Sequence, residues 1–160
     1  MIAFLLLVFS LLAYGKELQV PFVRQQDRLC GPASLSAVLS FYGIEVPQET
    51  IAEKVYHPKL KGALITDLEN YAKEKGLRAE TRRGELSDLR SLIDRGIPPI
   101  LLLETGRFGT SNPHYVVVVG YRERSFLLHT GYERAKVVGE RELDRMWEKM
   151  GRVMLLVYPP

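Results

Sequence analysis

The order of hydrophobic and polar positions divides the chain into two parts with different periods. In residues 30–96 hydrophobic side chains recur at helical spacing, whereas residues 99–158 contain short, continuous hydrophobic runs. The first helix is predicted to begin at Cys30 and to end before Gly43, since Pro32 suits a first helical turn. Its buried face is expected to carry hydrophobic residues at i, i+3, i+4 and i+7: Leu35, Val38, Leu39 and Tyr42.

Three more helices are predicted in this first part. One starts at residues 47–49 and stops before Pro58. The next has Thr66 and Glu69 at the spacing of a capping box and is followed by Gly76. After a brief strand at 77–82, Ser87 is expected to cap a helix that ends at Gly96.

The second part has the composition of strands. Residues 99–104 and 115–121 are continuous hydrophobic runs of strand length, and residues 105–113 form a glycine-containing loop between them, suited to the rim of a site. Further strands are predicted at 125–129, 136–138 and 152–158, with a helix over 140–150. Helices followed by antiparallel strands indicate an α+β fold.

Composition favours one ordinary globular domain. The chain has 160 residues, 46% of them hydrophobic, and residues 16–160 are expected to share one core. Lys and Arg exceed Asp and Glu by only 22 to 19, and apart from Arg78, Arg82 and Arg83 they are scattered, which argues against nucleic acid as a partner.

Residues 1–15 are uncharged and almost entirely apolar. As a helix they would span about 22 Å, short of the ~30 Å of a bilayer core, so a signal peptide is favoured over a spanning anchor. We therefore expect a periplasmic or secreted protein that meets export machinery and touches a membrane only through this segment. An uncleaved anchor and a mis-assigned start codon remain alternatives, because no positive residue precedes the apolar run.

Cys30 is the only cysteine and is the centre of the candidate chemistry. A lone cysteine on a core helix is often a small buried hydrophobe. At a helix N-terminus, however, backbone N–H groups and the helix dipole favour a thiolate, so a lowered pKa is expected for the Cys30 thiol. An exported protein with one cysteine also cannot form an internal disulfide, which leaves a reactive thiol or an intermolecular bridge.

The partners that a cysteine nucleophile needs can be named in the sequence. Gln25 lies five residues upstream, where its amide could donate to an oxyanion, and His114 opens the hydrophobic strand and could act as the base. His57, at the end of the second helix, is interpreted as a dipole partner or a surface residue. No metal or other cofactor is expected, because Cys30, His114 and His129 lack the short paired spacing of zinc ligands.

These residues resemble one known family. Gln25, the run Cys30-Gly31-Pro32-Ala33, and His114-Tyr115 leading a valine strand are similar to the papain-like peptidases that process bacteriocin leaders, cysteine peptidase family 39. The resemblance covers about residues 18–159. It implies a two-lobed thiol protease, with an N-terminal helical lobe packed on a C-terminal antiparallel β-sheet lobe, that acts on a peptide or protein. By this resemblance Cys30 would be the nucleophile, His114 the general base and Gln25 the oxyanion donor.

The sequence departs from the family at one position. Where the family has an aspartate that orients the histidine, this chain has Thr130. Its hydroxyl could accept the ring N–H instead, and His129 or a backbone carbonyl could also serve. Because of this departure, a catalytically weak or inactive peptide-binding module and a Cys-His acyltransferase stay open beside the peptidase. No phosphate-binding loop of a fused transporter ATPase is present, so the domain is expected to stand alone.

Overall fold

The computed structural model describes residues 15–160. The predicted signal peptide or anchor, apart from Gly15, therefore lies outside the described residues. The helices are α1 (Cys30–Phe41), α2 (Gln48–Val55), α3 (Ile65–Glu74), α4 (Leu86–Asp94) and α5 (Glu140–Glu148). The strands are β1 (Gly15–Glu17), β2 (Tyr56–His57), β3 (Gly62–Ala63), β4 (Arg78–Arg83), β5 (Ile100–Glu104), β6 (Pro113–Arg122), β7 (Ser125–His129), β8 (Lys136–Gly139) and β9 (Val153–Tyr158).

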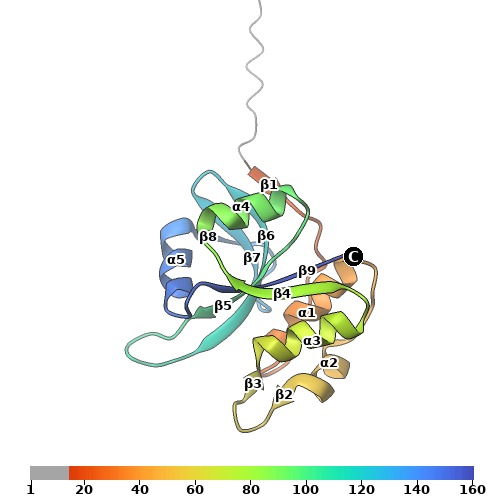
Figure 1. The fold of residues 1–160 in the computed structure, drawn as a ribbon. Coiled ribbons are helices and arrows are strands. Elements are labelled where there is room, and N and C mark those ends of the chain that lie inside the picture. Colours follow the sequence, from red (N-terminus) through yellow and green to blue (C-terminus); the bar gives the residue numbers. More distant parts are fainter. Residues whose placement is uncertain (1–14) are drawn as a thin grey trace, which may run out of the picture.

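A single antiparallel sheet is the frame of the molecule. Its strands follow the order β4-β9-β5-β6-β7-β8, and β1 adds to the far end of β6. A separate small hairpin is formed by β2 and β3. Figure 1 shows α1, α2 and α3 gathered on one side of the sheet and α5 on the other. The predicted α+β fold is confirmed.

The sheet is buried on both faces, which explains the unbroken valine run of β6. Tyr115, Val117 and Val119 belong to the core cluster beneath α1, α2 and α3, whereas Val116 and Val118 belong to the cluster beneath α4 and α5. A strand covered on both faces needs hydrophobic residues at consecutive positions rather than alternate ones. β6 therefore contributes to both cores, one on each face of the sheet.

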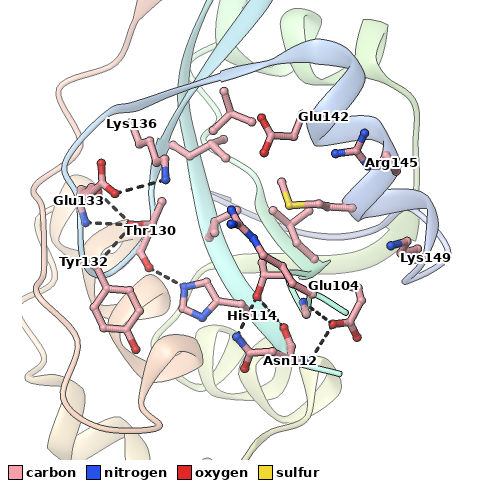
Figure 2. A pocket seen from close by; sticks show the side chains of 18 residues that line it. Glu104, Asn112, His114, Thr130, Tyr132, Glu133, Lys136, Glu142, Arg145 and Lys149 are labelled. Atoms are coloured by element: carbon pink, nitrogen blue, oxygen red, sulfur yellow. Dashed lines mark hydrogen bonds and ion pairs between the residues drawn. The ribbon is translucent and has the colours of Figure 1, made fainter. Parts of the chain in front are cut away.

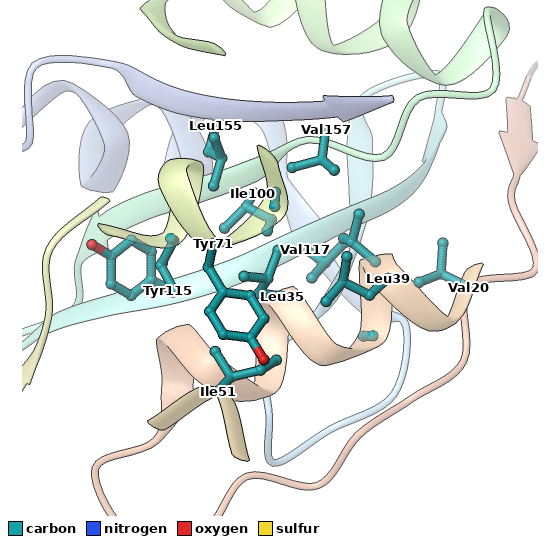
Figure 3. Packing of buried hydrophobic residues seen from close by; sticks show 14 of the residues in the cluster. Val20, Leu35, Leu39, Ile51, Tyr71, Ile100, Tyr115, Val117, Leu155 and Val157 are labelled. Atoms are coloured by element: carbon teal, nitrogen blue, oxygen red, sulfur yellow. The ribbon is translucent and has the colours of Figure 1, made fainter. Parts of the chain in front are cut away.

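α1 is the central helix of the first core. Nine of its twelve residues are buried, so it is enclosed on nearly all sides rather than along one stripe. Figure 3 shows Leu35 and Leu39 of α1 packed between Val117 of the sheet and Ile51 of α2. This packing fixes the N-terminus of α1, and with it Cys30, against β6.

Two predicted helix caps are wrong. α3 begins at Ile65 with no side-chain cap, so Thr66 lies inside its first turn. α4 begins at Leu86, and Glu85 and Asp88 form its capping box. The Asp88 carboxylate accepts the backbone N–H of Glu85 at 2.8 Å. A carboxylate took the place of the expected Ser87 hydroxyl because the helix starts earlier. Among residues 15–160, no helix is long and apolar enough to cross a membrane.

Candidate active site

Cys30 is the first residue of α1 and its side chain is partly buried against β6. The backbone N–H of Tyr115 is hydrogen-bonded to its sulfur, and the nearby N–H groups of Gly31 and of Cys30 itself also act to lower the pKa of the thiol. The Tyr115 N–H is free to do so because β7 pairs with β6 only from Val117 onward. The nucleophile candidate therefore lies at the open end of the β6–β7 pairing.

A glycine after the cysteine makes this close approach feasible. A Cβ at Gly31 would lie 3.2 Å from the Tyr115 ring and 3.3 Å from both Ala63 and Leu68. Such contacts on three sides would push the start of α1 away from the strand, since packed cores have little room for an added methyl group. Gly31 thus lets the Cys30 sulfur reach the Tyr115 N–H.

His114 lies immediately before Tyr115 at the start of β6. Its Nε2 donates to the backbone carbonyl of Thr130 at 2.6 Å. This bond fixes the hydrogen on Nε2, so that Nδ1 is left as the acceptor. The structure therefore brings the Cys30 sulfur to Tyr115, the residue next to His114 on β6, and His114 is in the form that can accept a proton.

The electrostatics of the pair differ from the expectation. Burial raises the pKa of the Cys30 thiol, and the three backbone N–H groups oppose this only in part. Burial also lowers the pKa of His114, against the opposing hydrogen bond to Thr130. The predicted lowering of the thiol pKa is thus wrong, because the sequence shows the helix terminus but not the burial around it. Both shifts favour the neutral forms, a thiol at Cys30 and an uncharged imidazole at His114.

Gln25 lies beside Tyr132 and Gly131, and its amide already has partners. Its Nε2 donates to the Tyr132 hydroxyl at 3.0 Å and, weakly, to the Gln26 carbonyl at 3.4 Å. Its Oε1 is buried against Gly131 and has no hydrogen-bond partner among the described residues. The role of oxyanion donor therefore stays a prediction for Gln25.

Tyr132 is a site residue that the sequence analysis missed. Its ring stacks on the His114 ring, with 5.7 Å between centroids and 11° between planes. Because its hydroxyl also accepts the Gln25 amide, Tyr132 connects the candidate base to the candidate oxyanion donor. The only signal in the sequence is its place two residues after Thr130, and a single exposed tyrosine in a loop indicates no role on its own.

The Thr130 hydroxyl does not contact the His114 ring. It accepts the N–H groups of Glu133 at 2.9 Å and Tyr132 at 3.3 Å, and so closes the turn after β7. The backbone carbonyl, one of the alternatives that the sequence left open, holds the imidazole instead. Thr130 thus positions His114 through its main chain.

We therefore expect Thr130→Val to reduce kcat/KM for peptide hydrolysis by less than about tenfold. The substitution removes the hydroxyl but leaves the carbonyl, whereas loss of a true orienting side chain costs about 10⁴-fold in a serine protease triad. Steady-state kinetics of the variant measure the difference. A loss of several thousandfold would assign the orienting role to the hydroxyl.

His129, the other candidate orienter, is engaged elsewhere. Its Nδ1 accepts the N–H of Ala135 at 3.0 Å and its Nε2 donates to the carbonyl of Val20 at 2.8 Å. It is buried and its pKa is lowered, mainly by desolvation. His129 therefore ties the N-terminal segment to the loop after β7.

His129 is expected to make folding sensitive to acid. Because its folded pKa is below the ordinary value of about 6.5, its contribution to stability is complete above pH 6.5 and is lost as the pH falls below it. His129→Gln does not titrate, so its urea unfolding free energy should fall less than wild type between pH 7.5 and 5. At pH 7.5 the variant should lose about 1–3 kcal/mol, because the Ala135 N–H loses its acceptor.

His114→Gln is the control for this measurement, since the pKa of His114 is also lowered. An unchanged acid dependence in His129→Gln, together with a reduced one in His114→Gln, would contradict the prediction. The acid sensitivity of folding would then belong to His114.

The remaining histidine lies outside the site. His57 of β2 pairs with Asp67 of α3, with 2.7 Å between Nε2 and Oδ2. This pair joins the β2–β3 hairpin to α3. Within residues 15–160 no three Cys, His, Asp or Glu side chains are grouped so as to hold a metal ion.

Comparison with known proteins identifies the family of this fold. A model of the Peptidase C39 like family matches residues 17–155. No curated protein matches the chain. The peptidase domain of Streptococcus ComA, a bifunctional ABC transporter involved in a quorum-sensing pathway, is 21% identical with a TM-score of 0.73, over 87% of this chain and 98% of that domain.

Two more solved structures are similar. A protein described as a C39-like peptidase from Bacillus anthracis is 18% identical, with a TM-score of 0.75 over 91% of this chain and 98% of its own. A double glycine motif protease from an AMS/PCAT transporter, solved in complex with the leader peptide, is 23% identical, with a TM-score of 0.74 over 90% and 94% of the two chains. At these identities the likeness establishes the fold.

Proposed function

Since the chain belongs to the Peptidase C39 like family, we propose that it is a cysteine peptidase that hydrolyses peptide bonds, with Cys30 as nucleophile and His114 as general base. One observation carries the proposal: the Cys30 sulfur accepts the N–H of Tyr115, the residue next to His114, whose ring is held by Thr130. Nucleophile, base and orienting group are the parts that acyl transfer requires.

The proposed reaction starts from the neutral pair. Nδ1 of His114 takes the thiol proton as the Cys30 sulfur attacks the scissile carbonyl carbon, and the carbonyl oxygen becomes an oxyanion. The imidazolium then gives this proton to the leaving amine, and a thioester remains on Cys30. Water, deprotonated by His114, hydrolyses the thioester and restores the thiol.

The oxyanion would be held by backbone and side-chain donors. One donor is the backbone N–H of Cys30, which lies next to the sulfur. The other is the Gln25 amide, whose Nε2 donates to the Tyr132 hydroxyl and, over a longer distance, to the Gln26 carbonyl. A developing oxyanion is a stronger acceptor than the Gln26 carbonyl at 3.4 Å. We therefore assign the second N–H of Gln25 to the oxyanion, while the Tyr132 hydroxyl keeps the amide in place.

The proposed substrate is a peptide or protein. The support is the double glycine motif protease, a solved structure of the same fold that holds a leader peptide. We further propose that this chain acts in the periplasm or outside the cell after export through its apolar segment 1–15, so that its substrate is met there. Fractionation of cells that produce the full chain tests the location, and recovery only in the cytoplasm would contradict it.

Alkylation of Cys30 separates the peptidase from an inactive peptide-binding module. For an activated pair, iodoacetamide should label Cys30 at least tenfold faster in wild type than in His114→Ala at pH 7.5, because His114 removes the thiol proton. His57→Ala is the matched control and should label at the wild-type rate. Equal rates in all three proteins would favour the binding module.

Cleavage of a defined peptide library tests hydrolysis itself. Mass spectrometry of the products identifies each cut, and addition of an amine such as glycine amide identifies transfer. Free carboxylates at the new C-termini are expected. Products that carry the added amine in place of water would identify an acyltransferase, and absence of any new product would overturn the proposed activity.

A further inference from the structure

A pocket of about 430 Å³ begins at His114 and runs along the sheet to α5. This volume lies within the range of ligand-binding sites. Figure 2 shows Thr130, Tyr132 and Glu133 along one side of the pocket and Glu142, Arg145 and Lys149 along the side of α5. The pocket is thus continuous with the candidate active site, although it lies on the α5 face of the sheet.

His114 lines this pocket but Cys30 does not. In the proposed reaction the histidine delivers its proton to the amine that leaves, so the substrate residues after the scissile bond must pass the imidazole. The residues before the bond stay attached to the Cys30 sulfur, and Cys30 does not line the pocket. The leaving part of the substrate therefore has direct access to the pocket.

The interior of the pocket combines an apolar floor with a charged rim. The floor is formed by aliphatic side chains and one methionine: Leu103, Val116, Leu128, Val138 and Met146. These residues offer contact to aliphatic side chains of a peptide. A methionine in such a surface adapts to different shapes, which suits a site that accepts several sequences.

Two carboxylates of the rim, Glu104 and Glu133, already have partners within the protein. Glu104 accepts the N–H groups of Gly106 and Asn112 and the hydroxyl of Ser111, which fixes the loop 105–112 as one wall. These contacts, led by the Asn112 N–H, hold the pKa of Glu104 below its usual range. Glu133 pairs with Lys136 at 3.3 Å.

The rim charges that remain are mainly positive. Arg107, Arg145 and Lys149 make no ion pair among the described residues, although the charge of Lys149 helps to lower the pKa of Glu104. Glu104 and Glu142 are the two rim carboxylates that likewise make no ion pair among these residues. Arg145 and Lys149 are exposed and four residues apart, so they lie on one face at the end of α5. A substrate carboxylate that lies beside them would be attracted by two positive charges.

We propose that this pocket binds the substrate residues that follow the scissile bond and selects an acidic side chain among aliphatic ones. The inference rests on the proposed peptidase activity and specifies its substrate class. Arg145 and Lys149 act as specificity-determining residues, whereas the chemistry stays with Cys30 and His114.

The test uses matched peptides built on the best-cleaved sequence from the library. The residues before the cut are constant, and each of the first four positions after it carries Glu or Lys in turn. In wild type, kcat/KM for Glu over Lys should be about 3–10 at one position or more, as two exposed charge pairs allow. In Arg145→Glu/Lys149→Glu this ratio should fall below 1.

The ratio is independent of the fraction of folded enzyme, so partial unfolding of the variant cannot imitate the effect. Arg141→Glu is the matched control, because Arg141 is exposed on the same helix but does not line the pocket, and it should keep the wild-type ratio. Cleavage with equal ratios in wild type and the double variant would overturn the pocket assignment alone. Absence of cleavage of every peptide would overturn the peptidase proposal, and the leaving-segment site with it.

Discussion

Replacing Cys30 with alanine is expected to abolish peptide hydrolysis, with kcat/KM reduced at least about 10⁴-fold. Removal of a catalytic nucleophile costs about 10⁶-fold in a serine protease, and no second cysteine exists in this chain to replace it. The structure supports a loss through chemistry rather than folding, because Cys30 is only partly buried. Initial rates on the best-cleaved library peptide measure the effect.

Two variants make the Cys30 result specific. Cys30→Ser keeps the size and the hydrogen bond to the Tyr115 N–H, but a hydroxyl is a far weaker nucleophile than a thiol, so it should be as inactive as the alanine variant. Ser40→Ala, near the other end of the same helix, should retain wild-type kinetics. Hydrolysis within tenfold of wild type in Cys30→Ala would place the nucleophile elsewhere.

Long periodic segments could be predicted from the sequence because their burial is regular. The spacing of Leu35, Val38 and Leu39 located α1, and the valine run located β6, since a strand covered on both faces has no polar positions. Helix starts were less predictable. Thr66 and Ser87 have the chemistry of caps, but tertiary packing started both helices earlier, so local preference was overridden.

The site was predictable only where neighbours along the chain define it. Cys30 at a helix start follows from Pro32 and the hydrophobic period, whereas its contact with the strand of His114 depends on pairing between distant segments, for which only family resemblance gave a signal. The direction of the Cys30 pKa could not be predicted, because desolvation depends on what covers the sulfur. The stacking of Tyr132 on His114 is likewise a property of the folded loop.

Thr130 shows why an atypical residue is compatible with the geometry. A side-chain orienter must be conserved in type, but a backbone carbonyl is supplied by any residue that adopts the same turn. Gly131, with a φ of 85°, allows this turn and brings the chain against Gln25, where a Cβ would lie 2.5 Å from Oε1. The turn therefore positions both the base and the amide without an aspartate.

His114→Ala is expected to lower kcat/KM for peptide hydrolysis by about 10²–10⁴-fold, the usual contribution of a general base. The loss is predicted to depend on pH. In wild type the rate should fall on the acid side only below about pH 6.5, because burial lowers the pKa of His114 and a protonated ring accepts no proton. The residual rate of the variant depends on free thiolate instead, and should rise with pH beyond 9, since the pKa of Cys30 is raised.

Measurements of kcat/KM from pH 5 to 10 distinguish a general base from a residue that only packs. A packing role would lower the rate by the same factor at every pH, whereas loss of the base gives the largest ratio of wild type to variant near pH 7 and a smaller one at pH 10. His57→Ala should follow the wild-type profile, since His57 pairs with Asp67 away from the sulfur. A variant profile parallel to wild type would remove His114 from the proton transfer and leave Cys30 without an assigned base.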